Sequence, residues 1–274
     1  MKKEASDLTE TKGLKAEIEA ADAVVKAANV KPVGKRKVTV RDIAKMIDHS
    51  LLRPDMTIEE IINGCKIAKE YDVVSVCVKP SEVDIVAREL KGTDVVLSTV
   101  IGFPHGGSTT ETKVFEANDA MKRGVVELDM VLNIGRLVSR DFAYVEKDIK
   151  AVVDAGHSKG AFVKVILENA YLTDELKEIA CKICDKVGAD FVKTSTGYAK
   201  SGATISDLKL MRKNTSSMVR VKAAGGVRTL DSALSIRAVG TARFGATATK
   251  VILDDAAKRA EAGTLFEVDE ATEL

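Results

Sequence analysis

Apolar and polar residues follow two different rhythms along most of this chain. From about residue 46 to residue 262, short runs rich in Val and Ile alternate with longer segments in which apolar residues recur at helical spacing. The short runs predict buried β-strands, and the periodic segments predict amphipathic α-helices. The expected strands span 46–50, 73–78, 95–101, 125–132, 161–167, 190–194, 219–224 and 242–245. The expected helices span 57–70, 81–90, 109–123, 140–157, 173–187, 205–214, 229–239 and 248–262.

The succession of eight strand–helix units defines the expected fold. Strands that are apolar nearly throughout are typical of a parallel sheet covered on both faces. Eight is the number of such strands that closes a (β/α)8 barrel. A doubly wound open sheet is the alternative, but it normally has fewer strands, and the chain has neither a G-x-G-x-x-G in its first unit nor a P-loop. The sequence therefore predicts an α/β fold, a (β/α)8 TIM barrel with an N-terminal helical extension.

The first 36 residues differ from the rest of the chain. Apolar residues recur at helical spacing within 7–29, and the Lys-Pro-Val-Gly-Lys segment at 31–35 breaks this pattern. We therefore expect residues 1–36 to form an amphipathic helical arm and linker. Residues 37–274 are expected to form the barrel, with a short acidic C-terminal tail. The arm could cover apolar surface on the barrel or contact another subunit.

Composition and charge argue against several classes of protein. The 274 residues carry a formal net charge of +1 without a basic block, so we expect no nucleic-acid surface. A membrane-spanning stretch and a secretory signal are not expected either. The four cysteines, Cys65, Cys77, Cys181 and Cys184, fit a reducing cytoplasm. Cys181-x-x-Cys184 could bind zinc or act in redox chemistry, but it has no second pair and lies in a helical pattern, so two small residues on a helix face are favoured.

Three lysines in successive strands are the strongest chemical signal. Lys164, Lys193 and Lys222 each interrupt an apolar strand, and we expect them at equivalent places in strands five, six and seven. Neighbouring strands lie about 4.8 Å apart, and like charges that close disfavour joint protonation. Lys193, with a cation expected on both sides, should lose its proton most easily and act as a Schiff-base nucleophile. The alternative is that the lysines point outward or form structural ion pairs with carboxylates such as Asp129 and Glu168.

Polar residues at the carboxyl ends of the other strands extend this candidate site. Asp129 shares one strand face with Glu127, and a carboxylate beside amines can move protons during imine formation. A salt bridge in the barrel core is the alternative role for Asp129. Asp48 in strand one and Cys77 in strand two are expected to support the site.

Two glycine-containing loops predict a phosphate site. Gly225, Gly226 and Arg228 follow strand seven, and Gly245 and Thr247 follow strand eight. Loops after these two strands, together with a helix N-terminus, form the usual phosphate site of such barrels. The loop after strand three, which contains His105, belongs to the same rim, and His105 is expected to be a rim residue rather than a catalytic base.

Five motifs together resemble a known enzyme family. They are Lys-Thr-Ser-Thr-Gly at 193–197, Val-Lys-Ala-Ala-Gly-Gly-Val-Arg at 221–228, Glu-Leu-Asp-Met-Val at 127–131, Gly-Phe-Pro-His-Gly at 102–106 and Ile-Asp-His-Ser-Leu-Leu at 47–52. This set is similar to that of the 2-deoxyribose-5-phosphate aldolases and covers about residues 41 to 253. Two positions at the phosphate end depart from the family pattern: Tyr198 stands where some members have a basic residue, and Ala248 stands where Ser is common.

The resemblance implies a reaction and a role for each motif residue. Lys193 would form the Schiff base, Lys222 would perturb its pKa, and Asp129 would shuttle protons through water. Gly197 would join the phosphate-binding set. The implied reaction is the reversible cleavage of 2-deoxy-D-ribose 5-phosphate to acetaldehyde and D-glyceraldehyde 3-phosphate, without a metal or an organic cofactor.

Two other functions remain open from the sequence. The first is a related lysine-dependent barrel aldolase, or an acyl-transferring enzyme, that acts on another sugar phosphate. The second is a barrel that only binds sugar phosphates, which Lys193, Lys222 and Asp129 argue against, because a binding protein needs no perturbed amine. The expected partners are a phosphorylated sugar and acetaldehyde, and a homo-oligomer, either dimer or tetramer, is left open.

Overall fold

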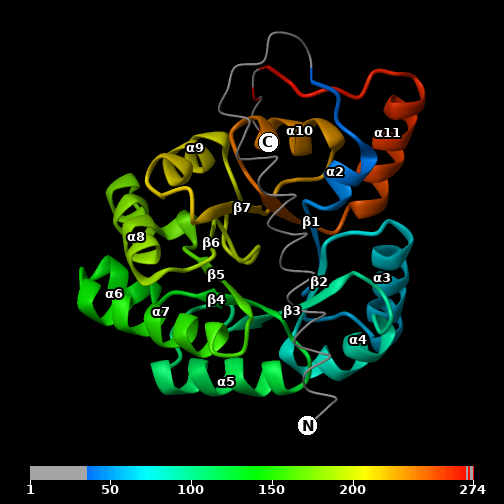
Figure 1. The fold of residues 1–274 in the computed structure, drawn as a ribbon. Helices are drawn as coiled ribbons and strands as arrows, with labels where there is room; N and C mark the ends of the chain where they lie inside the picture. The colour runs from blue at the N-terminus through cyan, green and yellow to red at the C-terminus, as the bar shows by residue number, and fades with distance from the viewer. Residues whose placement is uncertain (1–35, 270, 272–273) are drawn as a thin grey trace.

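The computed structural model describes residues 36–269, 271 and 274, and within them eight parallel strands close into a barrel (Figure 1). Each strand pairs with the next along the chain, and β8 closes the ring against β1. The strands are β1 (Ile47–Leu51), β2 (Ser75–Val78), β3 (Val96–Ile101), β4 (Glu127–Val131), β5 (Phe162–Ile166), β6 (Phe191–Lys193), β7 (Arg220–Ala224) and β8 (Arg243–Ala246). The predicted TIM barrel is therefore confirmed, and every expected strand lies where the apolar runs placed it.

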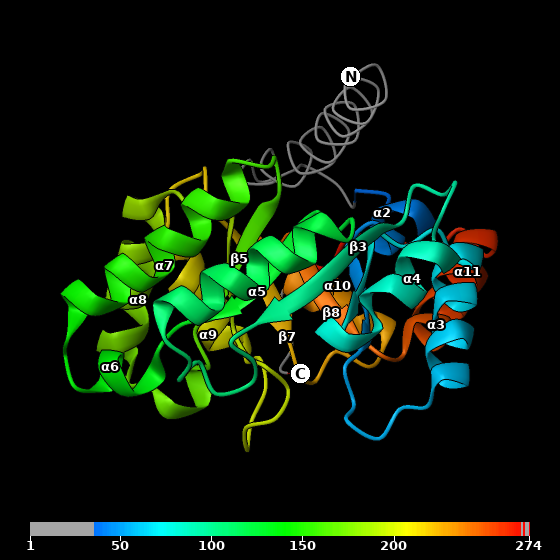
Figure 2. The same ribbon diagram turned by 90° about the horizontal axis from the view of Figure 1, so that it is seen from below.

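Helices surround the barrel and connect its strands (Figures 1 and 2). The expected helices are α3 (Ile58–Glu70), α4 (Val83–Glu89), α5 (Thr110–Lys122), α7 (Phe142–His157), α8 (Asp174–Val187), α9 (Ile205–Lys213), α10 (Leu230–Ala238) and α11 (Thr249–Glu261). The pattern did not predict α2 (Val40–Ala44), α6 (Ile134–Val138) or the 3-10 helices η2 (Pro80–Glu82) and η3 (Asn169–Tyr171). Each of these is too short to show a helical period in the sequence.

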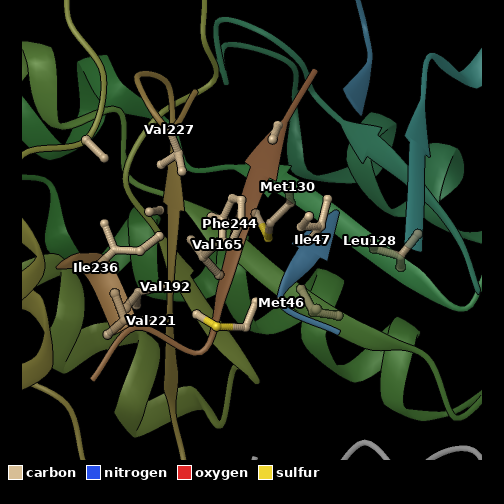
Figure 3. Packing of buried hydrophobic residues seen from close by; sticks show 14 of the residues in the cluster. Met46, Ile47, Leu128, Met130, Val165, Val192, Val221, Val227, Ile236 and Phe244 are labelled. Carbon is tan, nitrogen blue, oxygen red and sulfur yellow. The ribbon is translucent and has the colours of Figure 1, made fainter. Parts of the chain in front are cut away.

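Alternation along the strands separates an apolar outer layer from a charged interior. In β4, Leu128 and Met130 belong to the apolar layer shared with the helices, part of which is shown in Figure 3. Glu127 contacts Arg243 of β8, which is not a neighbouring strand, so Glu127 faces the inside of the barrel. Because successive residues point to opposite faces, Asp129 also faces inward.

The ends of the barrel domain are joined by backbone pairing. Lys37 and Phe266 form an antiparallel bridge, the Val38 N–H donates to the Leu265 carbonyl at 3.3 Å, and the Glu267 N–H donates to the Arg36 carbonyl at 2.9 Å. The arm expected over 1–36 lies outside the described residues except for its last residue, and its conformation and role remain predictions. In the described part of the chain, no helix is long and apolar enough to cross a membrane.

The Cys181-x-x-Cys184 pair lies on α8 with both thiols free and buried. Burial raises the pKa of Cys181 to about 12 and raises that of Cys184 well above its usual value. Thiols that hold their protons this firmly are poor metal ligands and poor nucleophiles. The described residues include no group of three or more His, Cys, Asp or Glu side chains suited to a metal ion. Two small residues on a helix face are thus the better description of this motif.

Candidate active site

The three strand lysines do not lie at one level of the barrel. Lys193 of β6 is the register partner of Lys222 of β7, as expected for neighbouring strands. Lys164 of β5, however, is the partner of Phe191, whereas Ile166 is the partner of Lys193. The expectation of three equivalent positions is therefore wrong for Lys164, which lies two residues closer to the amino end of the barrel.

One carboxylate binds all three lysines. Oδ2 of Asp129 lies 2.7 Å from Nζ of Lys193 and 2.8 Å from Nζ of Lys222. Its other oxygen, Oδ1, accepts a hydrogen bond of 2.9 Å from Lys164. The lysines therefore point inward, which contradicts the outward alternative, and they form ion pairs with Asp129 as the other alternative expected. Figure 1 shows β4, β5, β6 and β7, which supply these residues, as successive strands of the barrel.

Three further charged side chains, those of Glu127, Asp48 and Arg243, contact this cluster. Lys164 also binds Glu127 at 2.6 Å and Asp48 at 3.2 Å. Arg243 binds Asp48 at 3.0 Å and Glu127 at 3.4 Å, and Asp48 makes a close contact with Lys222. Asp48 thus contacts two of the three lysines, and its supporting role stays a prediction. The sequence argument missed Arg243, although its position two residues before Gly245 would have placed both on one strand face.

The cluster lowers the pKa of only one of its lysines. Burial is the main cause that lowers the pKa of Lys193, the Lys222 ammonium adds to it, and Asp129 opposes both. Burial also disfavours the charged form of Lys164, but the carboxylates of Asp129, Asp48 and Glu127 outweigh it and raise its pKa. For Lys222, the carboxylates of Asp129 and Asp48 likewise outweigh burial and raise the pKa. The expected cation on both sides of Lys193 is corrected: burial and Lys222 account for the shift.

The balance of buried charge supports the same assignment. The interacting group contains three carboxylates, those of Asp48, Glu127 and Asp129, and four basic side chains, those of Lys164, Lys193, Lys222 and Arg243. Although burial alone would raise the pKa of Asp129, the ammonium groups hold it well below its usual range, so this carboxylate stays ionised. With Lys193 neutral, three positive charges match three negative charges, which is the less costly state for a buried cluster.

Lys193 is also the lysine that a substrate can reach most readily. Its side chain keeps 4% of its surface exposed, compared with 0% for Lys164 and 1% for Lys222. Lys193 is the last residue of β6, and the active site of a TIM barrel lies at the carboxyl ends of the strands. A neutral amine in this position can attack a carbonyl carbon.

An apolar cluster lies beside the lysines. Cys77 packs with Leu52 and Val100, and Phe103 covers this group. Burial and the nearby Asp129 raise the pKa of the Cys77 thiol, so it stays protonated. Cys77 therefore supports the site by packing, and its side chain adds no charge next to Lys193.

Tyr198, one of the two departures from the family pattern, lies at the rim. Its hydroxyl donates to the Leu52 carbonyl at 2.6 Å, and its ring meets that of Phe103 edge-on, with centroids 5.5 Å apart. This pair joins the loops after β1, β3 and β6. The sequence argument noted Tyr198 only as a missing base and did not predict this contact.

The predicted phosphate residues lie at the same end of the barrel. Three of these glycines have positive φ values, which residues other than glycine rarely adopt: 92° at Gly197, 79° at Gly225 and 100° at Gly226. Gly245 is the register partner of Ala224 and is therefore adjacent to the loop that begins at Gly225. Arg228 and Thr247 are exposed in the loops that lead into α10 and α11.

The loops after β6 and β7 are in direct contact. The Ala203 N–H donates to the carbonyls of Ala224 and Gly225, both at 3.0 Å. A Cβ on Gly202 would lie only 2.5 Å from the Gly225 oxygen, so this approach requires glycine. The structure therefore brings together the loop that contains Gly197 and the loop that contains Gly225.

The histidines His49 and His105 differ in their exposure to solvent. His49 is buried in β1, and its Nδ1 lies 2.8 Å from the Thr249 hydroxyl at the start of α11. Burial lowers the pKa of His49 to about 4, so its ring is neutral at pH 7. His105 is exposed in the loop after β3, in agreement with its expected rim position.

Sequence and structure comparisons agree with this geometry. Residues 43–250 match the family described as DeoC/LacD family aldolase. The chain is 50% identical over 214 residues to the deoxyribose-phosphate aldolase of Clostridium perfringens (strain 13 / Type A), a match that covers 78% of this chain and 95% of that one. It is 52% identical over 215 residues to the deoxyribose-phosphate aldolase of Thermoanaerobacter pseudethanolicus, with 78% and 96% covered.

A solved structure extends the comparison to three dimensions. The tetrameric deoxyribose phosphate aldolase from Aeropyrum pernix superposes with a TM-score of 0.73 at 30% identity, over 79% of this chain and 92% of that one. The matched region of the family contains all eight strands and all the lysines and carboxylates of the buried cluster. From this match and these identities it follows that the chain belongs to the DeoC/LacD family of aldolases.

Proposed function

We propose that this protein is a class I aldolase that reversibly cleaves 2-deoxy-D-ribose 5-phosphate to D-glyceraldehyde 3-phosphate and acetaldehyde. The observation that carries the proposal is the shared contact of Lys193 and Lys222 with Oδ2 of Asp129. It would provide a neutral amine and a fixed ammonium, each within hydrogen-bond distance of the same carboxylate oxygen. The names of the relatives at 50% and 52% identity support the choice of substrate.

The reaction begins with attack by Lys193 on the aldehyde of the open-chain sugar. The Nζ lone pair forms a bond to C1, and the carbonyl oxygen takes a proton to give a carbinolamine. Loss of this hydroxyl as water leaves a protonated imine at C1. Oδ2 of Asp129 lies 2.7 Å from Nζ of Lys193 and 2.8 Å from Nζ of Lys222, so Asp129 and the Lys222 ammonium can pass the protons through a water molecule.

Cleavage then uses the imine as an electron sink. A base removes the proton of the C3 hydroxyl, C3 becomes a carbonyl, and the C2–C3 electron pair moves toward the iminium nitrogen. D-Glyceraldehyde 3-phosphate leaves, and the two remaining carbons stay on Lys193 as an enamine. Protonation at C2 and hydrolysis of the imine release acetaldehyde and restore the free amine. Since the iminium supplies the electron sink, we propose that no metal or organic cofactor takes part.

The phosphate would bind at the loops after β6, β7 and β8. Glycines with positive φ leave backbone N–H groups accessible to an anion, and Arg228 can add a charged donor. Gly197, Gly225, Gly226, Gly245 and Thr247 complete the proposed set. Ala248 is the N-cap of α11 and makes no side-chain capping bond, so the first N–H groups of that helix are left for another acceptor.

The activity is tested by product analysis with a small set of sugar phosphates. Incubation with 2-deoxy-D-ribose 5-phosphate should yield equal amounts of acetaldehyde and glyceraldehyde 3-phosphate, measured by coupled dehydrogenases. The alternative, a related lysine-dependent aldolase or an acyl-transferring enzyme acting on another sugar phosphate, would be favoured if ketose phosphates were turned over faster.

We further propose a homo-oligomer in a reducing cytoplasm. The tetramer named for the Aeropyrum pernix relative and the four free cysteines support these two statements. Light scattering on the purified chain distinguishes a monomer from a dimer or a tetramer.

A further inference from the structure

Glu168 has an unusual backbone for its residue type. It is the second residue after the end of β5. Its backbone angles, φ 58° and ψ 63°, lie in the left-handed region that residues other than Gly, Asn and Asp rarely adopt. The residue is nevertheless buried at the carboxyl end of the barrel, with 2% of its surface exposed. Strained residues of this kind persist where the surrounding structure over-determines them, often beside a functional site.

The Glu168 carboxylate binds the loop that follows the Schiff-base lysine. Its two oxygens lie 3.2 and 3.3 Å from the backbone nitrogen of Thr196, and the Thr196 hydroxyl makes a close hydrogen bond to Oε2. The same hydroxyl accepts the N–H of Tyr198 at 3.0 Å. One carboxylate thus fixes the backbone on both sides of Gly197. The sequence argument had considered Glu168 only as an ion-pair partner for the lysines and did not predict its contact with Thr196.

The contact between Glu168 and Thr196 lies just beyond the point where the backbone pairing of β5 with β6 ends. β6 has only three residues and stops at Lys193. On the β7 side, the Thr194 hydroxyl continues the pairing, since it accepts the Ala224 N–H at 3.0 Å and donates to the Ala224 carbonyl at 3.2 Å. On the β5 side, the Asn169 N–H donates to the Thr194 carbonyl at 2.9 Å, and the Glu168 carboxylate takes the next position along.

We propose that Glu168 is a positioning residue that holds the segment from Thr196 to Tyr198 in the conformation that binds the substrate phosphate. This inference rests on the proposed function and deepens it, because it assigns a role in phosphate binding to Glu168, a residue that follows β5. Glu168 does not touch the reacting carbons. It acts through Thr196, and the chain reversal at Glu168 brings its carboxylate to that residue.

The chemistry of the two donors explains the choice of a carboxylate. An amide N–H and a hydroxyl both need an acceptor, and a charged carboxylate accepts two hydrogen bonds more strongly than a neutral group does. Glutamine keeps one acceptor oxygen but has no charge, so it would hold the two donors more weakly. Alanine would leave a buried N–H without an acceptor, which is costly for the conformation of the loop.

The test compares a phosphorylated substrate with its unphosphorylated counterpart. The variants are Glu168→Gln, Glu168→Ala, Thr196→Val and Thr196→Ser, with Glu175→Gln as a matched control on the exposed face of α8. The KM for 2-deoxyribose 5-phosphate should rise about tenfold in Glu168→Ala, and less in Glu168→Gln, as expected for the loss of one hydrogen bond to a charged group. The kcat/KM for 2-deoxyribose should change less than about twofold. Thr196→Ser keeps the hydroxyl and should raise the KM less than Thr196→Val does, and Glu175→Gln should behave like the wild type.

A double-mutant cycle shows whether Glu168 acts through Thr196. Glu168→Ala should have a smaller effect in a Thr196→Val background than in the wild type, because the hydroxyl contact is already lost and only the Thr196 N–H still binds the carboxylate. Equal losses on both substrates, an unchanged KM in Glu168→Ala, or additive effects in the cycle would each overturn the proposal. If Glu168→Ala does not fold, Thr196→Val against Thr196→Ser gives the same comparison.

The failure of this proposal is distinguishable from failure of the proposed function. Acetaldehyde and borohydride should still label Lys193 in every Glu168 variant, since the lysine cluster does not include Glu168. A wild-type protein that neither cleaves the sugar phosphate nor forms this adduct would contradict the function itself. A wild type that does both, with Glu168 variants unchanged in KM, contradicts only the role of Glu168.

Discussion

Lys193 and Lys222 are register partners on neighbouring strands, and both reach the same oxygen of Asp129, at 2.7 and 2.8 Å. Two buried amines that share one acceptor oxygen cannot both be fully charged at low cost. Lys222 has a second carboxylate, Asp48, as a partner, whereas within residues 36–269 the carboxylate that pairs with the Lys193 amine is Asp129. We therefore expect the proton to stay on Lys222 and Lys193 to be the nucleophilic amine.

Replacing Lys222 should move the pH dependence of imine formation. In the wild type, burial and the Lys222 ammonium lower the pKa of Lys193, so the reactive amine appears as pH rises through that lowered value. Lys222→Leu removes the neighbouring ammonium and leaves Oδ2 of Asp129 to Lys193. Both changes raise the pKa of Lys193. The rate of Schiff-base formation should fall steeply at pH 7, and its rise should move to higher pH. Profiles that coincide and differ only in amplitude would show that Lys222 positions the substrate instead.

Asp129→Asn should impair both catalysis and stability. Loss of general acid–base help typically lowers kcat by about 10²–10⁴. The variant also leaves buried ammonium groups short of a partner, which typically costs about 3–5 kcal/mol in the free energy of unfolding. Steady-state kinetics and urea unfolding measure the two effects separately. A variant with near-normal kcat would limit Asp129 to a structural role.

Removal of Arg228 should weaken binding of the phosphorylated substrate. Charge-assisted hydrogen bonds contribute about 1.5–3 kcal/mol, so Arg228→Ala should raise the KM for 2-deoxyribose 5-phosphate by about tenfold or more. Inorganic sulfate should compete with the substrate in the wild type and compete less in the variant. Arg41→Ala is the control, since Arg41 is an exposed residue of α2 that pairs with Asp72. Equal inhibition by sulfate in wild type and Arg228→Ala would place the anion elsewhere.

His49 should make the protein sensitive to mild acid. Its pKa is lowered to about 4 by burial, so the folded protein binds this proton less readily than the unfolded chain, whose His titrates near 6.5. The stabilisation is fully present above pH 6.5 and is lost as pH falls from 6.5 toward 4. Between pH 7 and pH 5 we expect a loss of about 2 kcal/mol in the free energy of unfolding.

Urea unfolding of wild type and His49→Gln at the two pH values measures this loss. The variant should show a smaller decrease, and His105→Gln, which changes an exposed residue, should behave like the wild type. An equal decrease in all three proteins would assign the acid sensitivity to other groups.

Strand and helix positions were predictable because a TIM barrel repeats one simple pattern. Apolar runs such as 161–167 and helical periods such as 173–187 each occupy the length of one element, so existence and order follow directly. The helices α2 and α6 have five residues each, which is less than two turns, and no period can appear over that length.

The sequence predicted which strand residues face the candidate site better than it predicted their height along the barrel axis. Alternation fixes which strand face a residue occupies, but not its height along the barrel axis, because a shift of two residues keeps the same face. Lys164 was therefore placed on the correct face and at the wrong level relative to Lys193. Height depends on the stagger between strands, which arises from closure of the barrel and leaves no local mark in the sequence.

The contacts of Glu168 and Arg243 depend on the same long-range geometry. Arg243 crosses the barrel from β8 to Glu127 of β4, and Glu168 reaches Thr196 through a left-handed backbone. Neither the cross-barrel distance nor a positive φ at a glutamate can be deduced from residue type. The chemistry of a charged residue beside an apolar strand is visible in the sequence, but its partner is not.

Reductive trapping is the most direct test of the central claim that Lys193 is the nucleophile. The protein is incubated with acetaldehyde and borohydride at neutral pH, digested, and the modified lysine is mapped by mass spectrometry. We predict a stable two-carbon adduct on Lys193, no active-site adduct in Lys193→Ala, and loss of aldolase activity in that variant. Stable labelling of Lys222 or Lys164 in the wild type, or full activity in Lys193→Ala, would contradict the account.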